Sequence, residues 1–309
     1  MRVAVVGSGG IGAFLGGGLA RSGQDVSFLA RGKHLDAMRS RGLIVESISL
    51  GNFQLKVNAT DKPTDIGKVD LVLFCVKSYD TETALQQIGP LIGEDTTVLC
   101  FQNGVDNEDE IAAAVGKEHV LAGAIFVESY IAEPGKIVQS SGPWRIVIGE
   151  MDGAITPRAK SIHEALEKAG LKCELSNGIQ EILWEKFLFI CATGGVCSVS
   201  RASLGQVLEF PSTRELYVSS LREIAAVAKA KGMKLADDIV ARTLARADNL
   251  NKATKPSMLR DLEHGKRLEV DALNGTVTRF GRELAVPTPV NDFIYATLKL
   301  QDLNNERGT

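Results

Sequence analysis

The sequence predicts a doubly wound α/β sheet with an antiparallel extension, followed by an all-helical C-terminal domain. Three observations predict this fold. A glycine loop stands between a strand and a helix at the start of the chain, strands and helices then alternate, and the hydrophobic period becomes helical from about Ile179. The 309 residues are enough for two hydrophobic cores. We therefore expect two domains, over residues 1–178 and 179–309.

The first strand, Arg2–Val6, runs directly into a G-x-G-x-x-G loop and then into a helix. Gly7 permits the tight turn, Gly9 lets a pyrophosphate approach the backbone, and Gly12 lets helix and strand pack closely. The helix N-terminus offers free N–H groups to the phosphates. This context predicts a Rossmann-type dinucleotide site, and the alternative is a glycine-rich turn in another α/β protein. The predicted cofactor-binding residues of the loop are Gly7, Ser8, Gly9, Gly10, Ile11 and Gly12.

The second strand, Asp25–Leu29, indicates which dinucleotide is bound. An NAD site usually has an acid at the end of this strand, but here Ala30 and Arg31 follow. The forked guanidinium of an arginine suits a 2′-phosphate, so the sequence favours NADP. The alternative is that Arg31 and Lys33 only flank a solvated loop.

The rest of the first half alternates between strands and helices, as a parallel sheet requires. The run Val69–Val76 is almost wholly apolar, which is typical of a buried parallel strand. Glu133 and Pro134 separate two strands as a hairpin turn would. The remaining predicted elements are a helix at His34–Ser40, strands at Leu43–Ile48 and Phe53–Val57, a helix at Thr81–Ile92, a strand at Thr96–Phe101, a helix to Val115, hairpin strands at Val120–Ile131 and Gly135–Gln139, a strand at Arg145–Ile148, a helix at Pro157–Ala169 and a strand at Lys172–Leu175.

After Asn177 and Gly178 the sequence shows no further convincing strand. Apolar residues recur at helical spacing from Ile179 to Ile190, and prolines separate the later helices. The predicted helices that follow are Thr213–Lys231, Asp237–Ala247, Met258–His264, Glu269–Phe280 and Asn291–Leu300.

Polar residues at the ends of two buried strands are candidates for a ligand site. Lys77 and Asn103 each follow such a strand, and ligands of open parallel sheets sit beyond the carboxyl ends of the strands. The alternatives are ordinary: Lys77 could be a loop lysine, and Asn103 a turn residue or a helix cap.

Three more polar residues stand out in the helical half. Lys186 interrupts an apolar helix face, as either a snorkelling side chain or a general acid. Glu269 is followed one turn later by Leu273, which suggests a carboxylate aimed partly inward rather than a solvated face. Ser257 follows Pro256 at a helix start, so it is either an N-cap or a hydroxyl that binds a substrate carboxylate.

Composition argues against several other classes of protein. The formal net charge is −3 and no basic patch is interleaved with aromatic residues, so nucleic acid is not an expected partner. The five cysteines lack C-x-x-C spacing and the four histidines lack metal-ligand spacing, which suggests a reduced cytoplasmic protein with no metal. Because a predicted strand opens the chain, we expect no signal peptide, and we expect the apolar stretch Leu188–Val199 to be too short for a membrane span.

Taken together, the motifs resemble one family. They are the glycine loop, Leu29-Ala30-Arg31, Cys75-Val76-Lys77-Ser78-Tyr79-Asp80, Gln102-Asn103-Gly104-Val105-Asp106-Asn107-Glu108, Trp184-Glu185-Lys186, Ser257-Met258-Leu259-Arg260-Asp261 and Glu269-Val270-Asp271-Ala272-Leu273-Asn274-Gly275. In order and spacing the chain resembles the ketopantoate reductase (2-dehydropantoate 2-reductase) family nearly end to end.

The resemblance implies NADPH-dependent reduction of a 2-oxo acid on the route to pantothenate and coenzyme A. It implies Lys186 as the proton donor, Glu269 as the residue that orients substrate and lysine beside the cofactor, and Ser257 as the binder of the substrate carboxylate. Asn103 would hold nicotinamide or substrate, and Arg31 and Lys77 would contact the cofactor. The resemblance also implies a homodimer.

One departure from the family pattern concerns the substrate. Members usually carry asparagines four and eight residues after the lysine, where this chain has Ile190 and Gly194. A mandelate-type D-2-hydroxyacid dehydrogenase that acts on another branched or aromatic 2-oxo acid therefore stays an alternative. A dinucleotide-binding sensor without turnover is a second alternative, although such a protein would need neither Lys186 nor Glu269.

Overall fold

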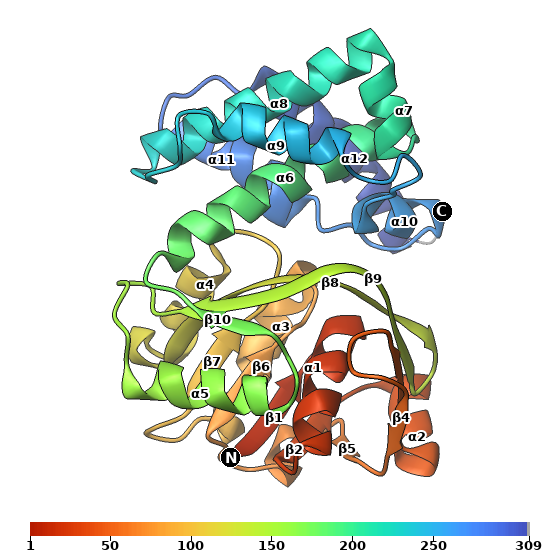
Figure 1. Cartoon of the computed structure of the whole chain (residues 1–309), viewed down its shortest axis with the longest axis vertical. Helices are drawn as coiled ribbons and strands as arrows, with labels where there is room; N and C mark the ends of the chain where they lie inside the picture. Colours follow the sequence, from red (N-terminus) through yellow and green to blue (C-terminus); the bar gives the residue numbers. More distant parts are fainter. Residues whose placement is uncertain (308–309) are drawn as a thin grey trace. The chain divides into compact units, whose positions relative to one another are not determined.

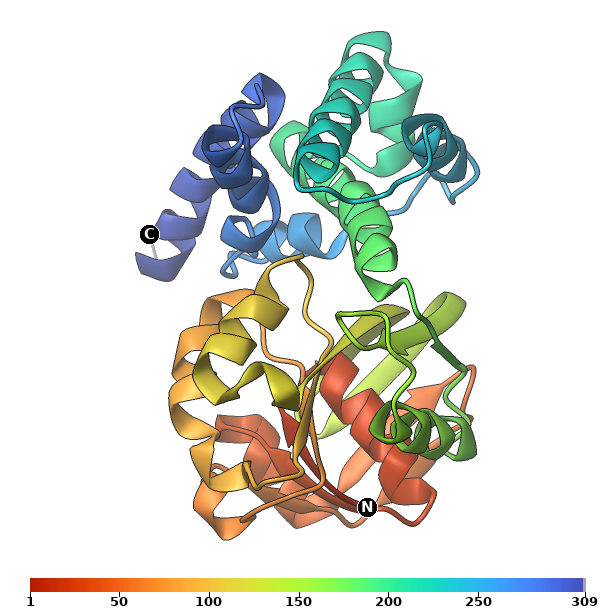
Figure 2. The same cartoon turned by 90° about the vertical axis from the view of Figure 1, so that its left-hand side faces the viewer.

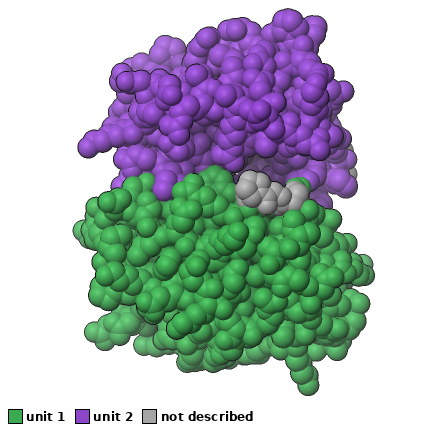
Figure 3. Space-filling model, in the orientation of Figure 1, with its two compact units in different colours: residues 1–102, 106–179 green, residues 103–105, 180–309 purple. Residues whose placement is uncertain are grey.

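The computed structural model describes residues 1–307, apart from the side chains of residues 141–143. It divides into two compact units (Figure 3). Unit 1 comprises residues 1–102 and 106–179, and unit 2 comprises residues 103–105 and 180–309. The first unit is built on a mixed sheet and the second on helices, which confirms the predicted fold class (Figure 1).

The described strands of unit 1 form one 10-stranded sheet in the order β4-β3-β9-β8-β7-β6-β1-β2-β5, with β10 paired to β9. The stretch from β8 to β5 is parallel throughout and has the strand order of a doubly wound dinucleotide-binding fold. Its switch point lies between β1 and β6. The strands are β1 (Arg2–Val6), β2 (Asp25–Leu29), β3 (Leu43–Ser47), β4 (Phe53–Leu55), β5 (Asn58–Thr60), β6 (Leu71–Phe74), β7 (Thr97–Cys100), β8 (Val120–Glu133), β9 (Lys136–Gly149) and β10 (Cys173–Leu175).

The antiparallel extension contains one long hairpin of β8 and β9, and β4 pairs antiparallel with β3 at the edge of the sheet. The sequence predicted separate strands at Gly135–Gln139 and Arg145–Ile148, and this was wrong because both belong to β9. The polar stretch between them breaks the apolar alternation, but β8 is equally long and its ladder continues past that stretch with register shifts.

Helices cover both faces of the sheet (Figure 2). Helices α1 and α5 lie on one face and α3 and α4 on the other. Strand β1 serves both cores, because Val3 and Val5 pack with the α1 and α5 side, whereas Ala4 and Val6 pack with the α3 and α4 side. The helices of unit 1 are α1 (Gly10–Arg21), α2 (Gly32–Arg41), α3 (Thr81–Gln87), α4 (Asn107–Val115) and α5 (Pro157–Lys168), with 3-10 turns at Pro63–Asp65, Ser78–Asp80, Gly89–Leu91 and Lys117–His119.

Unit 2 is helical throughout its described elements. Its longest helix, α6, continues through Gly194 and Gly195. A Cβ atom on Gly195 would lie 2.8 Å from Asn274 Nδ2, so the glycine allows a close approach to the segment after Glu269. The helices are α6 (Ile179–Ser200), α7 (Leu204–Glu209), α8 (Pro211–Ala230), α9 (Ile239–Asp248), α10 (Ser257–Glu263), α11 (Thr276–Glu283) and α12 (Pro289–Arg307); the sequence did not predict α7.

The predicted helix Glu269–Phe280 was wrong in its first part. Residues Asp271–Gly275 form a π-helical turn, in which the Gly275 N–H donates to the Val270 carbonyl at 2.9 Å, and α11 follows. A Cβ on Gly275 would lie 2.9 Å from the Tyr295 ring, so α12 packs tightly against the turn. Wide turns of this kind occur frequently at functional sites.

Within residues 1–307, α6 is the one helix long and apolar enough to cross a membrane by length and composition. The expectation that its apolar stretch is too short was wrong about length, because the helix has 22 residues. However, 72% of the apolar window is buried inside the protein, as in a core helix.

Glu108 is a buried carboxyl group near the start of α4, and its Oε2 has no hydrogen-bond partner. The pKa of Glu108 is raised to about 7, mainly by burial and to a smaller extent by the nearby Asp106 and Asp109, against hydrogen bonds from its own backbone and the Cys100 thiol that lower it. An acid whose folded pKa exceeds its unfolded value stabilises the fold below the unfolded pKa, near 4.5. That contribution is lost as the pH rises through about 7.

We therefore expect the free energy of unfolding of Glu108→Gln to exceed that of the wild type by an amount that grows as the pH rises. The difference should be small near pH 5 and on the order of 2 kcal/mol in favour of the variant near pH 8. Thermal unfolding at both pH values measures it, with the exposed Glu94→Gln as control. A difference that does not change with pH would contradict a buried, titrating Glu108.

Candidate functional site

The glycine loop packs tightly on one side and is open on the other. Gly7 has φ +94°, and a Cβ there would lie 2.5 Å from the Val76 backbone N, at the end of the neighbouring strand. A Cβ on Gly12 would lie 2.2 Å from the Gly7 carbonyl oxygen. A Cβ on Gly9, by contrast, meets nothing within 4 Å. The loop therefore leaves room at the one glycine where a ligand phosphate is expected.

Helix α1 begins directly after Gly9, which is extended and caps the helix without a side-chain hydrogen bond. The first-turn amides of a helix have no partners within it, and they carry the positive end of the helix dipole. The Ser8 hydroxyl does not compete for them, because Ser8 Oγ donates to the Leu29 carbonyl at 2.7 Å. The helix N-terminus is thus available to an anion.

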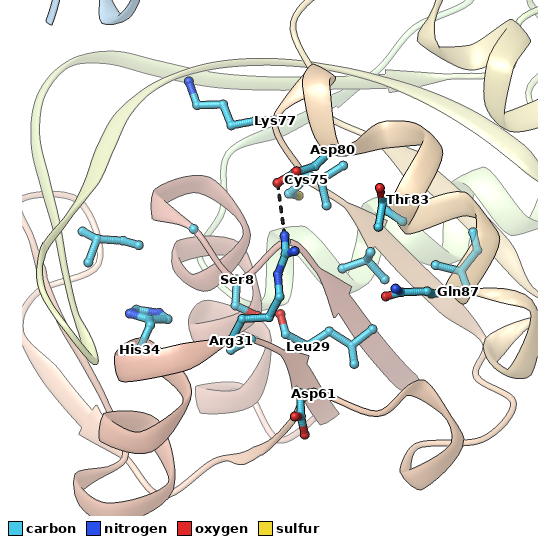
Figure 4. A pocket seen from close by; sticks show the side chains of 18 residues that line it. Ser8, Leu29, Arg31, His34, Asp61, Cys75, Lys77, Asp80, Thr83 and Gln87 are labelled. Atoms are coloured by element: carbon cyan, nitrogen blue, oxygen red, sulfur yellow. Dashed lines mark hydrogen bonds and ion pairs between the residues drawn. The ribbon is translucent and has the colours of Figure 1, made fainter. Parts of the chain in front are cut away.

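A pocket of about 280 Å³ lies over this loop (Figure 4). Five of the predicted cofactor-binding residues line it, and each comes from the loop or the end of a neighbouring strand. Gly10 and Gly12 instead face protein, since a Cβ on Gly10 would lie 2.3 Å from the Ser129 carbonyl oxygen. The predicted residues that line the pocket are Gly7, Ser8, Gly9, Arg31 and Lys77; other lining residues include His34, Asp61, Asp80, Thr83 and Gln87.

Arg31 precedes α2 and extends over the pocket toward Asp80 (Figure 4). Its Nη2 lies 3.1 Å from Asp80 Oδ2, and the two side chains are 74% and 35% exposed. An ion pair this exposed contributes little to stability. Arg31 can therefore leave Asp80 for a ligand anion, or bind both at once. Asp80 was missed as a site residue, although it ends the predicted motif that begins at Cys75.

Asp61 is an acid that the sequence did not place in this pocket. It follows β5, a strand of three polar or small residues that was not predicted. Because Leu29 pairs with Thr60, the end of β5 lies beside the end of β2. Asp61 Oδ1 also lies 3.6 Å from Arg39 Nη2, which offsets its charge.

Lys186 is buried in the helical unit, with 7% of its surface exposed. Its helix neighbours Leu183 and Phe187 belong to the buried apolar residues of this unit. Burying a lysine to this degree is costly unless nearby groups compensate for the lost hydration of its ammonium. Lys186 is thus a largely buried residue, and its role as a general acid stays a prediction.

Glu269 is equally buried, at 7% exposure, directly before the π-helical turn. The chain is fixed on both sides of it. The Leu268 N–H donates to buried Asp302 at 2.7 Å, and buried Asn274 donates to Asn291 Oδ1 at 3.0 Å. These two hydrogen bonds hold the chain on both sides of Glu269, as the support of a functional group requires.

Ser257 and Asn103 also belong to unit 2. Ser257 is exposed and is the first residue of α10, whose N-cap is Pro256, so the helix-cap alternative for Ser257 was wrong. Asn103 follows β7 but leaves the sheet, and Val105 beside it packs against the helical core. Asn103 does not cap α4 either, because Asp106 holds that position.

Gly194 lies where the helix of Lys186 contacts the segments that carry Ser257 and Glu269. A Cβ on Gly194 would lie 3.2 Å from the Met258 methyl and 3.9 Å from Leu273 Cδ1. The helix of Lys186 therefore touches the residue after Ser257 and the turn after Glu269. The surroundings of Gly194 are therefore apolar, whereas an asparagine at this position would place an amide there.

No group of three or more side chains among the described residues could hold a metal ion. The cysteines Cys75, Cys100, Cys173, Cys191 and Cys197 are free thiols. Burial raises the pKa of Cys197 to about 12, so this thiol stays protonated near neutral pH.

Family models match nearly the whole chain. The model of ketopantoate reductase PanE/ApbA matches residues 3–153, and the model of its C-terminal part matches residues 178–302. The chain belongs to the ketopantoate reductase PanE/ApbA family. It is therefore an oxidoreductase of this family, as the motifs predicted.

Individual relatives cover the chain almost completely. The 2-dehydropantoate 2-reductase of Archaeoglobus fulgidus is 33% identical over 94% of both chains. The uncharacterized oxidoreductase YkpB of Bacillus subtilis is 30% identical over 98% of this chain and 99% of its own. A solved PanE/ApbA family ketopantoate reductase from Ralstonia eutropha JMP134 has a TM-score of 0.91 at 31% identity and covers 99% of this chain and 100% of its own.

A D-mandelate dehydrogenase solved with NADH and anilino(oxo)acetate shares the fold. Its TM-score is 0.90 at 23% identity, and the match covers 99% of this chain and 100% of that one.

The contrast between Gly9 and Gly12 gives a test of the glycine loop. We expect Gly9→Ala to keep the thermal stability of the wild type, because its Cβ has open space, but to weaken dinucleotide binding at least tenfold, since the methyl would occupy the phosphate position. Gly12→Ala should lower the melting temperature, because its Cβ would overlap backbone. Thermal unfolding and fluorescence titration with NADPH measure both. Unchanged NADPH affinity in Gly9→Ala would place the phosphates elsewhere.

Proposed function

We propose that this protein reduces 2-dehydropantoate (ketopantoate) to D-pantoate with NADPH, in the cytoplasm, as a step toward coenzyme A. The observation that carries the proposal is the buried Lys186 in a reductase of this family, on a helix that contacts the segments of Ser257 and Glu269. We assign residues 1–178 to the NADP-binding domain. Residues 179–309 would bind the substrate and form the interface of a homodimer.

The glycine-loop pocket fits a dinucleotide. Gly9 leaves open space beside a helix N-terminus that no side chain caps, and Arg31 extends over the same pocket. When bound, the nicotinamide would supply the hydride that reduces the substrate carbon. Lys77 lines the pocket and would add a positive charge to the phosphate surroundings.

Arg31 supports NADPH over NADH. Its guanidinium is the largely exposed cation at the end of β2 and can bind a 2′-phosphate with two hydrogen bonds. Asp61 and Asp80 line the same pocket and would repel that phosphate, but Arg39 and Arg31 itself offset their charges. The proposed preference therefore depends on Arg31 turning from Asp80 toward the phosphate.

The residues of unit 2 would bind the 2-oxo acid and supply the proton for its reduction. The Ser257 hydroxyl would donate a hydrogen bond to the substrate carboxylate, and the Asn103 amide would hold the substrate or the nicotinamide. As the hydride reaches C2, negative charge develops on the carbonyl oxygen, and the Lys186 ammonium would stabilise that charge. A proton would then pass from Lys186 Nζ to this oxygen and complete the alcohol. The Glu269 carboxylate would orient the Lys186 ammonium and the substrate hydroxyl.

A second candidate is a mandelate-type D-2-hydroxyacid dehydrogenase acting on another branched or aromatic 2-oxo acid. Ile190 and Gly194, with Met258 and Leu273 beside Gly194, present apolar surface where the family usually has amides. Such a surface cannot bond the hydroxyl of ketopantoate, and it favours a substrate with an apolar side chain.

The catalytic role of Lys186 can be tested by substitution. We expect Lys186→Ala to lower kcat by about 10²–10⁴-fold, because the proton donor and the positive charge at the oxyanion are lost. Lys186→Met, which keeps the length of the side chain, should lose as much. The NADPH dissociation constant should change little in either variant. Steady-state kinetics and fluorescence titration measure these quantities.

The exposed Lys234→Ala in the same unit is the matched control and should turn over like the wild type. A Lys186→Met enzyme with normal kcat would remove Lys186 from the mechanism. Tight NADPH binding without turnover of any 2-oxo acid by the wild type would favour a sensor instead.

A further inference from the structure

His34 has no part in the mechanism above, yet its side chain lines the cofactor pocket. It lies in the first turn of α2, and Figure 4 shows its ring among the pocket-lining residues with Ser8 and Arg31. From the sequence His34 was one of four scattered histidines. Only the folding of α2 against the glycine loop and the β8–β9 hairpin brings it to this site.

The hydrogen bond to Nδ1 determines where the ring carries its proton. The Gly135 backbone N–H, at the turn of the β8–β9 hairpin, donates to His34 Nδ1 at 3.1 Å. An Nδ1 that accepts a hydrogen bond has no hydrogen, so a neutral imidazole carries its hydrogen on Nε2. Burial lowers the pKa of His34 more than the Ser8 backbone raises it, which keeps the ring neutral near pH 7.

His34 Nε2 is buried and has no hydrogen-bond partner in the protein. A buried N–H without an acceptor is unfavourable and uncommon, and such groups often await a ligand. The Ser8 backbone carbonyl lies near enough to raise the pKa of the ring, but Nε2 makes no hydrogen bond to it of acceptable geometry. The Ser8 hydroxyl and the Arg31 guanidinium are themselves donors, to Leu29 and Asp80. His34 Nε2 is therefore a fixed donor, enclosed at the wall of the pocket, that lacks a hydrogen-bond partner.

We infer that the Nε2–H of His34 donates a hydrogen bond to a phosphate oxygen of the bound dinucleotide. Phosphate oxygens are strong acceptors without hydrogens, which matches a side-chain atom that can only donate here. The pyrophosphate is expected at the glycine loop and the 2′-phosphate at Arg31, and His34 lines the same pocket as both. The inference rests on the dinucleotide binding in the proposed function but not on the identity of the 2-oxo acid.

Two substitutions of His34 distinguish hydrogen-bond donation by Nε2 from the structural contact of the ring with Gly135. In His34→Asn the side-chain oxygen can still accept from the Gly135 N–H, but the Nε2 donor is lost. In His34→Gln the amide nitrogen can replace the Nε2 donor, but the acceptor for Gly135 is lost. Melting temperatures without ligand would show whether either variant is unfolded.

We expect fluorescence titration to show about tenfold or greater loss of NADPH affinity for His34→Asn. His34→Gln should bind within about threefold of the wild type. Steady-state kinetics should show a higher KM for NADPH with kcat little changed in His34→Asn. Titration with NADH identifies the acceptor: an equal loss assigns the pyrophosphate, and a loss for NADPH alone assigns the 2′-phosphate.

Wild-type affinity of a folded His34→Asn for both cofactors would overturn the inference. So would a loss confined to His34→Gln, because it would assign the ring a purely structural contact with Gly135. These results are distinct from a failure of the proposed function, in which the wild type binds NADPH but does not reduce ketopantoate. A wild type that binds neither cofactor would overturn both.

Discussion

The close approach of three backbone segments at the glycine loop is the constraint on which the rest of unit 1 depends. The end of β1, the start of α1 and the end of β6 meet where Gly7 and Gly12 leave no room for a Cβ. This contact sets the angle at which α1 crosses the sheet, and it directs the helix N-terminus toward the ends of β2 and β6. Because Gly9 is not needed for packing, the same loop leaves an open position for a ligand. One short motif therefore fixes both the fold of the unit and the place of its pocket.

In unit 2 the corresponding constraint is a set of polar residues held inside an apolar core. Asn291 is bonded by Ser220, Asn274 and Glu223, and the Glu223 carboxylate also accepts from the first amides of α12. These bonds hold the π-helical turn after Glu269 against α8 and α12. Buried polar groups cost stability when they lack a partner, as Asn274 Oδ1 does, so the hydrogen bonds that are made favour one arrangement of the chain. A catalytic carboxylate and ammonium need such a rigid surrounding more than they need flexibility.

The sequence predicted well what local pattern determines. The strand Asp25–Leu29 and the glycine loop were found because apolar period and glycine spacing are local signals. Strand β5 was missed, since Asn58–Thr60 has no apolar pattern and exists through its pairing with β2. From the sequence the π-helical turn looks like ordinary helix. The feature that sets it apart is the close packing of Gly275 against Tyr295, which lies far away in the sequence. For the same reason His34 and Asp61 could not be assigned to the pocket, whereas Arg31 and Lys77 follow strands that mark its edge.

This oxidoreductase of the PanE/ApbA family is proposed to reduce ketopantoate with NADPH. The most direct measurement is the decrease in NADPH absorbance with purified protein and ketopantoate, 2-oxoisovalerate or benzoylformate, with NADH as the control cofactor. We expect fast turnover of ketopantoate, with NADPH preferred to NADH. Turnover of benzoylformate or 2-oxoisovalerate in place of ketopantoate would contradict the assigned substrate and show that Ile190 and Gly194 have redirected the site. An absence of turnover with all three acids, despite tight NADPH binding, would contradict the catalytic assignment itself.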